Sequence, residues 1–234
     1  EVGPADASVL APVHNSKRGI AVACGLAPGI GDAANNGDPY QMALAGIDEA
    51  VRNLVCVGAD PSRIAILDNF CWPSCEKPEN LGTLVRAAEA CYDGAKAYRT
   101  PFVSGKDSLN NQFKVTDPAT GATTTIEIPP TLLISGIGIV PSTARCVTMD
   151  AKEVGNLLVV IGTTVPNLGG SHYQRVFGLP PKANRSEGCE RIPETDLDVG
   201  PRTARAIAEC IRLGLVRSCH DCSDGGLLVA VAEM

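Results

Sequence analysis

The chain has 234 residues, 44% of them hydrophobic, which is enough to bury the core of one large domain or two smaller ones. Its formal net charge is −6 and it contains no basic run, which argues against binding to nucleic acid or to an anionic membrane surface. The longest apolar run, residues 157–162, is far too short to span a bilayer, and we expect a cytoplasmic location.

The ten cysteines do not indicate a disulfide scaffold, because a chain of this size and apolar content does not need one. Cys71 and Cys75, and likewise Cys219 and Cys222, have spacings found in metal sites. A structural zinc ion takes four ligands, and these two pairs lie far apart in the sequence with no third pair at ligand spacing. We therefore favour reduced thiols that pack in the core or in loops.

A helix is expected over 40–57, where apolar residues recur at helical spacing after a loop rich in Gly, Asn and Asp. Within it, Glu49 and Asn53 are four residues apart and project from one face. A carboxylate and an amide at that spacing suit a cation that prefers oxygen ligands, such as Mg²⁺. Asp48 and Arg52 have the same spacing and predict an ion pair.

Strands are expected over 20–25 and 64–67, and the second is followed directly by Asp68. A carboxylate at the end of a strand is where open α/β folds place ligand contacts. The run Glu-Lys-Pro-Glu at 76–79 then leads into a second helix with an apolar stripe.

A short strand over 102–104 runs into a dense polar cluster. In this cluster Gly105 lets a ligand approach the backbone, and Lys106 offers a positive charge to a phosphate. Asp107 can face a metal, and Ser108 offers a hydroxyl to either. The pattern is not a P-loop, and a plain turn with a solvated lysine stays open as the alternative. If the cluster is a site, its chemistry is that of a nucleotide phosphate with a divalent cation.

The middle of the chain suggests a division into two domains. A turn-rich polar interruption over 116–125 precedes a long strand over 131–140. Charged and small residues then replace the apolar strand over 141–155. We expect a first domain over 1–150 and the beginning of a second over 151–234.

In the second domain we expect a strand over 156–162, a mobile surface loop over 177–195 and a helix over 200–213. The cluster His-Asp-Cys-Ser-Asp-Gly-Gly at 220–226 stands before another helix, a position suited to an anionic ligand or to a metal that bridges one. The chain begins without methionine and ends within an apolar stretch, so we expect a fragment of a longer protein.

Five segments in the same order make nearly the whole chain resemble the second half of the phosphoribosylformylglycinamidine synthases. The segments are Asp-Glu-Ala-Val-Arg-Asn at 48–53, Leu-Asp-Asn-Phe-Cys-Trp at 67–72, Glu-Lys-Pro-Glu at 76–79, Ser-Gly-Lys-Asp-Ser at 104–108 and His-Asp-Cys-Ser-Asp-Gly-Gly-Leu-Leu at 220–228.

The resemblance implies an α/β (α+β) fold, in which an N-terminal domain like that of aminoimidazole ribonucleotide synthetase, with a mixed sheet and flanking helices, precedes a truncated α+β C-terminal domain. Glu49, Asn53 and Asp221 correspond to Mg²⁺ ligands of the family, and Ser223 to a nucleotide contact. Asp68, Gly105 and Ser108 correspond to residues that help to complete the ATP and substrate site.

Lys106 marks a departure within the family. The short bacterial enzymes often have Gly-Asn where this chain has Gly-Lys, which instead resembles the long form. An ammonium group cannot ligate Mg²⁺ but it can contact phosphate. We therefore assign Lys106 to the nucleotide rather than to the metal.

The reaction that the resemblance implies is ATP-dependent conversion of formylglycinamide ribonucleotide to its amidine, with ammonia from a glutaminase subunit or domain. The catalytic histidine of the family lies in the first half, so we assign no catalytic residue and expect this chain alone to be inactive. Two alternatives stay open: a non-catalytic structural half with an auxiliary nucleotide site, or a related synthetase of the aminoimidazole ribonucleotide type. Because the two halves of the family pair sheet to sheet, we also expect a homodimer when the partner half is absent.

Overall fold

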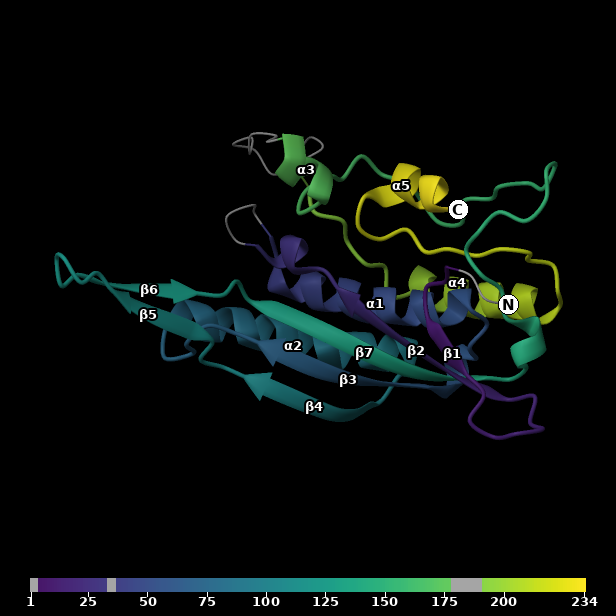
Figure 1. Ribbon diagram of the computed structural model, residues 1–234, viewed down its shortest axis with the longest axis horizontal. Coiled ribbons are helices and arrows are strands. Elements are labelled where there is room, and N and C mark those ends of the chain that lie inside the picture. Colours follow the sequence, from purple (N-terminus) through teal and green to yellow (C-terminus); the bar gives the residue numbers. More distant parts are fainter. Residues whose placement is uncertain (1–3, 33–36, 178–190) are drawn as a thin grey trace.

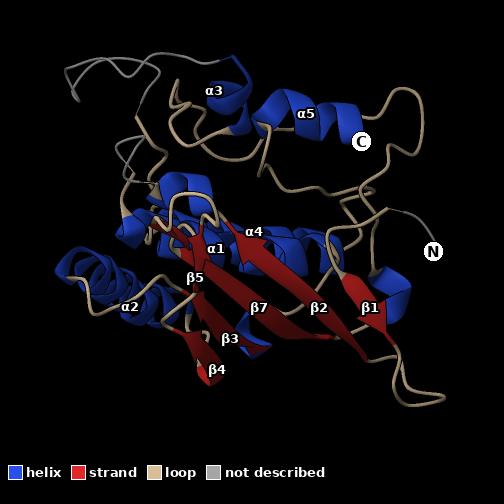
Figure 2. Ribbon diagram, turned by 60° about the vertical axis from the view of Figure 1, so that its left-hand side comes forward, coloured by secondary structure: helices blue, strands red, loops and turns tan. Residues whose placement is uncertain are grey.

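A five-stranded mixed sheet lies at the centre of the N-terminal part of the molecule (Figures 1 and 2). The computed structural model describes residues 4–32, 37–177 and 191–234. In spatial order the strands are β1 (Ser8–Leu10), β2 (Gly19–Leu26), β7 (Thr131–Val140), β3 (Ile64–Cys71) and β4 (Phe102–Ser108). Only β3 and β4 run parallel, and the other neighbouring pairs are antiparallel. The expected mixed sheet with flanking helices is confirmed.

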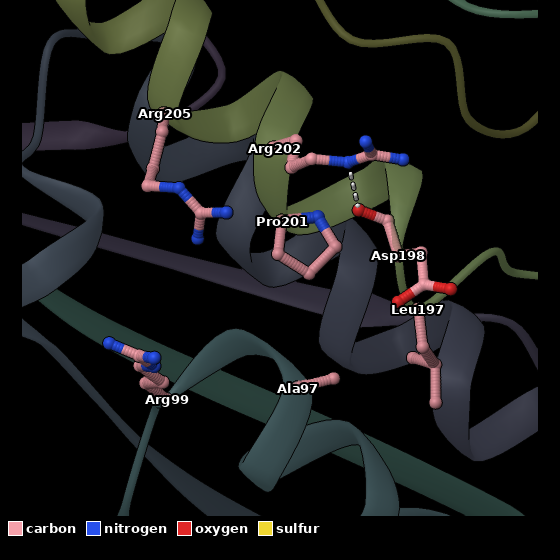
Figure 3. A pocket seen from close by; sticks show the side chains of 7 residues that line it. All are labelled: Ala97, Arg99, Leu197, Asp198, Pro201, Arg202 and Arg205. Carbon is pink, nitrogen blue, oxygen red and sulfur yellow. Dashed lines mark hydrogen bonds between the residues drawn. The ribbon is translucent and has the colours of Figure 1, made fainter.

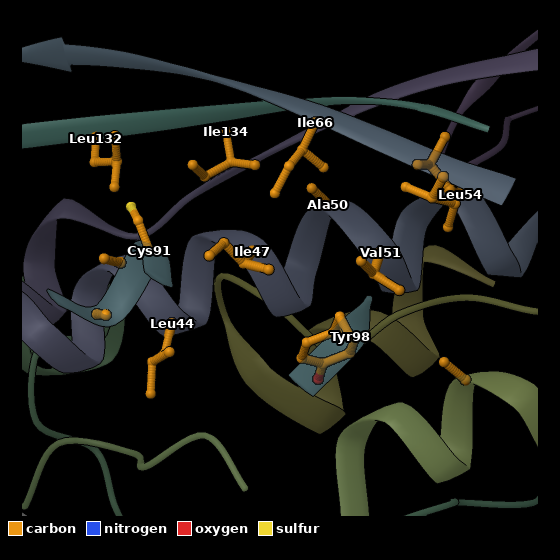
Figure 4. Packing of buried hydrophobic residues seen from close by; sticks show 14 of the residues in the cluster. Leu44, Ile47, Ala50, Val51, Leu54, Ile66, Cys91, Tyr98, Leu132 and Ile134 are labelled. Atoms are coloured by element: carbon orange, nitrogen blue, oxygen red, sulfur yellow. The ribbon is translucent and has the colours of Figure 1, made fainter. Parts of the chain in front are cut away.

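Helices α1 (Pro39–Cys56) and α2 (Pro78–Tyr98) cover one face of this sheet (Figure 2). Helix α1 begins where the Asp38 side chain accepts a hydrogen bond from the Tyr40 backbone, with proline at the first helical position. Figure 4 shows its apolar face packed against side chains from the strands. The fully buried residues at this contact include Ile47, Ala50, Leu54, Ile66, Leu132 and Ile134.

The contact between α1 and β2 is unusually close because glycines face each other there. A Cβ atom added to Gly25 would lie 2.0 Å from the carbonyl oxygen of Gly46. No residue with a side chain fits at position 25 while the helix keeps this distance. The close approach brings the polar face of α1 within hydrogen-bonding reach of the β2 backbone.

The opposite face of the sheet is not covered by any helix in the part of the chain that the structure describes. Four apolar side chains on that face are between 37% and 44% exposed: Val22, Leu26, Leu67 and Ile137. A hairpin of β5 (Gln112–Thr116) and β6 (Thr123–Glu127) extends away from one end of the sheet (Figure 1). The ion pair between Lys77 and Glu127, 2.8 Å long, joins the hairpin to the start of α2.

The C-terminal part lies on the far side of α1 (Figure 1). Helix α4 (Val199–Arg212) packs against α1, and the short helices α3 (His172–Phe177) and α5 (Gly226–Glu233) lie beyond it. The expected helix over 200–213 is therefore confirmed, and so is a helix that directly follows the cluster at 220–226.

The strand expected over 156–162 is not present, and this prediction was wrong. Residues 156–161 have neither helical nor strand structure, and Leu157 is 90% exposed. A strand needs a neighbouring strand to satisfy its backbone groups, and no described segment pairs with this one. An apolar run is therefore not sufficient for a strand when no neighbouring strand is available to pair with it.

Three other expectations also need correction. Asp68 does not follow a strand, because β3 continues to Cys71. The strand expected over 102–104 is longer than predicted, since β4 continues to Ser108 through pairing with β3. The interval 116–125 contains ends of β5 and β6 as well as a turn. Most of the loop expected over 177–195 lies outside the described residues.

Candidate functional site

Glu49 and Asn53 lie on the face of α1 that meets β2. The Leu26 backbone N–H donates to Glu49 Oε2 at 2.8 Å, and Asn53 Nδ2 donates to the Cys24 carbonyl at 2.9 Å. Strand β1 pairs only with residues 20–22, so the edge of β2 beyond them has no neighbouring strand among the described residues. Side chains of α1 therefore take the place of a strand at this edge. Glu49 Oε1 and Asn53 Oδ1 have no hydrogen-bond partner in the described part of the chain.

Arg52 joins α1 to the segment before α5. Its Nε lies 2.7 Å from Asp48 Oδ2, which confirms the ion pair expected from their spacing. Its Nη1 donates to Asp221 Oδ2 at 2.8 Å and to the Cys222 carbonyl at 2.9 Å. Burial by itself would lower the pKa of Arg52, but the two carboxylates hold it above the ordinary value.

Asp221 is the most deeply buried of the predicted site residues, with a side chain only 4% exposed. Burial raises the pKa of Asp221 to about 7, against the lowering effect of Arg52 and with a further increase from Asp6. A carboxyl group with a pKa so far above its usual range marks a candidate functional position.

Asp6 and His220 complete a compact group with Asp221 whose ligand atoms all lie within 4.8 Å of one another. Asp6 Oδ1 lies 2.6 Å from His220 Nδ1 and accepts from the Asp221 backbone N–H at 3.2 Å. The Asp6 side chain is 2% exposed, yet its Oδ2 has no hydrogen-bond partner among the described residues. Since a buried carboxylate oxygen without a partner is costly, this atom indicates a place for a cation.

These residues together fit a cation that prefers oxygen ligands. Asp6 and Asn53 line the same cavity of about 850 Å³, between β1, β2 and residues 146–148. The backbone N–H of Asp221 donates to Asp6, and the charge of Glu49 contributes to the raised pKa of Asp221. Carboxylate and amide oxygens are the kind of protein ligand that Mg²⁺ takes, usually one or two of them together with water and phosphate oxygens. We refer to Asp6, Glu49, Asn53 and Asp221 as the α1 cluster.

Sequence reasoning missed Asp6 and gave His220 no role. Asp6 meets Asp221 across 215 positions of sequence, and no local spacing connects them. The one available signal was a carboxylate two residues ahead of the short run Ser-Val-Leu that forms β1.

Ser223 lies on the same segment as Asp221 and is exposed. Its carbonyl accepts from the Gly226 backbone N–H at 3.0 Å, which shapes the turn into α5. Burial raises the pKa of Glu49, and the charge of Asp224, the residue after Ser223, acts in the same direction. Ser223 is therefore placed beside the α1 cluster, with its hydroxyl free of any partner among the described residues.

The remaining predicted residues lie at the other edge of the sheet, on β3 and β4. Asp68 pairs with Gly105 across the two strands, and a Cβ atom at Gly105 would lie 2.5 Å from Asp68 Oδ1. Glycine is therefore needed for this carboxylate to lie against β4. Burial, followed by the charge of Asp107, raises the pKa of Asp68.

Lys106 and Ser108 point to the opposite face from Asp68, because side chains alternate along β4. The Lys106 ammonium donates to the Ser108 hydroxyl on this uncovered face. Strands β7 and β3 separate β2, and with it the α1 cluster, from β4. The structure therefore places Glu49 and Asn53 on α1 and joins Asp221 to this helix through Arg52. Asp68, Gly105, Lys106 and Ser108 lie on β3 and β4, toward the other edge of the sheet.

A second hollow, of about 530 Å³, lies between the end of α2 and the start of α4 (Figure 3). Arg99, Arg202 and Arg205 line it, and Arg202 Nε donates to the Asp198 carbonyl at 2.9 Å. It contains none of the predicted site residues.

The sequence matches two family models in tandem. The model of the AIR synthase related protein, N-terminal domain, matches residues 4–140, and that of the C-terminal domain matches residues 153–234. In the described part of the chain no helix is both long and apolar enough to cross a membrane.

Among curated proteins, the chain is similar to the phosphoribosylformylglycinamidine synthase subunit PurL of several organisms. It is 37% identical over 225 residues to that of Erythrobacter litoralis, which covers 95% of this chain and 28% of the relative. It is 35% identical over 197 residues to that of Thermococcus sibiricus, with coverage of 84% and 25%. The chain thus spans between a quarter and a third of the length of these relatives.

A solved structure supports the fold. The chain resembles T. maritima PurL complexed with FGAR, with a TM-score of 0.61 over 97% of this chain and 32% of the other, at 18% identity. At this identity the likeness shows the fold alone. The family model that matches residues 4–140 covers more than half of the chain and shows that the chain belongs to the family of AIR synthase related proteins.

Proposed function

We propose that this chain is the part of a phosphoribosylformylglycinamidine synthase that carries one Mg²⁺–nucleotide site. The observation that carries the proposal is the similarity of 84% or more of the chain to PurL subunits at 33% to 37% identity. The parent enzyme would use ATP to convert formylglycinamide ribonucleotide to the amidine. The partners would be the first half of the enzyme and a glutaminase subunit or domain that supplies ammonia.

The α1 cluster is the proposed Mg²⁺ site. Asp6, Glu49, Asn53 and Asp221 would supply the oxygen ligands, and Ser223 would contact the nucleotide. When bound, the cation would neutralise the charge of the nucleotide phosphates. The role of Arg52 is to hold Asp221 against α1, through the 2.8 Å contact with its carboxylate. Glu49 and Asn53 are held in turn by the β2 backbone, so the oxygens are positioned before a ligand arrives.

Lys106 and Ser108 would act from the uncovered face of the sheet. Two strands at a spacing of ~4.8 Å lie between β2 and β4, so we assign these residues to ligand groups held between this chain and the partner half. Lys106 is suited to a phosphate group there, and Asp68 and Gly105 would shape the strand that presents it. The expected homodimer would form through the same face, because a second copy would cover it when the partner half is absent.

We also propose a domain boundary near residue 150. One family model matches residues up to 140 and the other begins at residue 153. A first domain over 1–150 and a second over 151–234 would place the boundary in the interval between them. The bonds that connect the two parts, such as that between Arg52 and Asp221, would then form between domains.

An activity assay tests the proposal. Full-length parent protein supplied with ATP, Mg²⁺, ammonium chloride and formylglycinamide ribonucleotide should form the amidine. Asp221→Asn should lower this activity at least tenfold, whereas the surface substitution Glu153→Gln should leave it unchanged. The 234-residue chain alone should be inactive. No amidine from the full-length protein would contradict the proposed reaction, and full activity of Asp221→Asn would contradict the proposed site.

A further inference from the structure

Two free thiols from distant parts of the sequence lie in contact. The sulfur atoms of Cys56 and Cys219 are 3.4 Å apart, although 163 positions separate the residues. Cys56 is buried at the end of α1, and Cys219 is half-buried in the segment that leads to α5. The sulfurs need to approach by only roughly 1.4 Å to reach the length of a disulfide bond.

Neighbouring contacts hold the two residues in this position. Arg52 lies one turn before Cys56 on α1, and it donates to Asp221 and to the Cys222 carbonyl. On the other side, the Cys219 backbone N–H donates to the Thr148 carbonyl at 3.3 Å. The segment that carries Cys219 is therefore fixed to α1 and to the loop at residue 148, so the thiols face each other as part of the fold.

We infer that Cys56 and Cys219 form a reversible disulfide that joins α1 to the segment before α5. The oxidant would be a small disulfide such as oxidised glutathione. Cys219, the more exposed of the two, attacks it as the thiolate, releases one small thiol and becomes a mixed disulfide. Cys56 then loses its proton, attacks the Cys219 sulfur and releases the second small thiol. Two electrons pass to the oxidant, and a reducing thiol reverses both steps.

The bond would restrain the segment that contains Asp221. In the reduced protein the hydrogen bonds of Arg52 to Asp221 and to the Cys222 carbonyl hold this segment to α1 without a covalent link. A covalent link one turn further along α1 limits how far this segment can open. Oxidation would therefore keep the segment that carries Asp221 close to α1.

Peptide mapping tests the link directly. The full-length protein is treated with oxidised glutathione, free thiols are alkylated, and the protein is digested with trypsin without reduction. Cleavage after Arg52 and Arg63 isolates Cys56 as the one cysteine in its peptide, and cleavage after Arg217 isolates Cys219 together with Cys222. We expect one species in which these two peptides are joined, and its loss after addition of dithiothreitol.

Two serine substitutions show whether Cys219 or Cys222 is the residue linked to Cys56. Cys219→Ser should abolish the joined species, and Cys222→Ser should leave it intact. The inference is overturned if both peptides are recovered fully alkylated, if Cys219 pairs with Cys222 within one peptide, or if the joined species persists in Cys219→Ser.

Hydrogen exchange provides an independent readout. Oxidation should slow backbone exchange over residues 219–226 at least threefold in the wild-type protein and in Cys222→Ser, but not in Cys219→Ser. Equal exchange in the oxidised and reduced wild-type protein would overturn the proposed restraint on this segment.

Discussion

At the scale of single residues, Arg52 is the connection on which the α1 cluster depends. It pairs with Asp48 on its own helix and with Asp221, whose side chain is 4% exposed. Arg52→Met would leave the Asp221 carboxyl buried without its counter-charge. We expect a loss of about 2–3 kcal/mol in the free energy of unfolding, below the range for fully buried pairs because the Arg52 side chain is one-third exposed.

Urea denaturation at pH 7 measures this change. Arg217→Met is the matched control, because Arg217 pairs with Glu153 on the surface, where both side chains are more than 60% exposed. The control should unfold at nearly the same urea concentration as the wild type. Equal effects of the two substitutions would show that the Arg52 pair adds nothing beyond a surface contact.

The raised pKa of Asp221 makes stability depend on pH in a defined direction. An aspartate in an unfolded chain has a pKa of about 3.9, whereas burial raises the pKa of Asp221 to about 7 in the folded chain. Between these values the folded state binds the proton more tightly, so this residue makes the free energy of unfolding fall as pH rises from about 4 to 7. Asp221→Asn should remove this contribution, and its stability should therefore fall less between pH 5 and pH 8.

The experiment compares urea midpoints at both pH values, with EDTA present so that cation binding does not contribute. A parallel decline in the wild type and in Asp221→Asn would mean that another group causes the dependence.

Sequence reasoning identified part of the α1 cluster and could not identify the rest. Glu49 and Asn53 were accessible because helical spacing of four places side chains on one face, and Asp221 was accessible through the family resemblance. Asp6 was not, because it joins Asp221 only once β1 is paired with β2 and the C-terminal segment has folded back over α1. A contact across 215 positions leaves no periodic trace in the sequence.

At the scale of elements, the helices were more accessible to sequence reasoning than the strands. Apolar residues at helical spacing correctly indicated α1 and α2, and the Gly-Pro pair at 200–201 correctly indicated α4. The apolar run at 156–162 carries as strong a signal for a strand but has no neighbour to pair with among the described residues. The extent of β4 was likewise underestimated, because its polar residues are tolerated at the edge of a sheet where side chains stay exposed.

Gly105 and Gly82 differ in whether the surrounding structure has room for a side chain. Gly105→Ala on β4 would place a Cβ atom 2.5 Å from Asp68 Oδ1, and we expect it to cost about 1–2 kcal/mol. Gly82 lies inside α2 with no atom within 4 Å of its added Cβ. Gly82→Ala should therefore stabilise the protein by about 0.5–1 kcal/mol through helix propensity.

Thermal and urea unfolding of both variants provides the measurement. Opposite signs are the expected result. If Gly105→Ala matches the wild type, the carboxylate of Asp68 does not lie against β4 as described.

At the scale of the whole molecule, the uncovered face of the sheet predicts association. Val22, Leu26, Leu67 and Ile137 are exposed together on this face, and soluble proteins rarely leave such a patch uncovered. In the absence of the partner half we expect the chain to form a homodimer through it. Ile137→Lys should give a monomer, because a buried lysine without a partner opposes association.

Light scattering at micromolar concentration gives the mass. Val85→Lys is the control, since Val85 is similarly exposed but lies on α2, away from the sheet face. The control should remain dimeric. A wild-type chain with the mass of a monomer would contradict the prediction.

The proposed Mg²⁺–nucleotide site is tested most directly by a crystal structure of the full-length protein with Mg²⁺ and a non-hydrolysable ATP analogue. In this part of the chain we expect a cation ligated by oxygens of Asp6, Glu49, Asn53 and Asp221, with the phosphates beside Ser223. A saturated nucleotide whose cation contacts none of these four residues would contradict it.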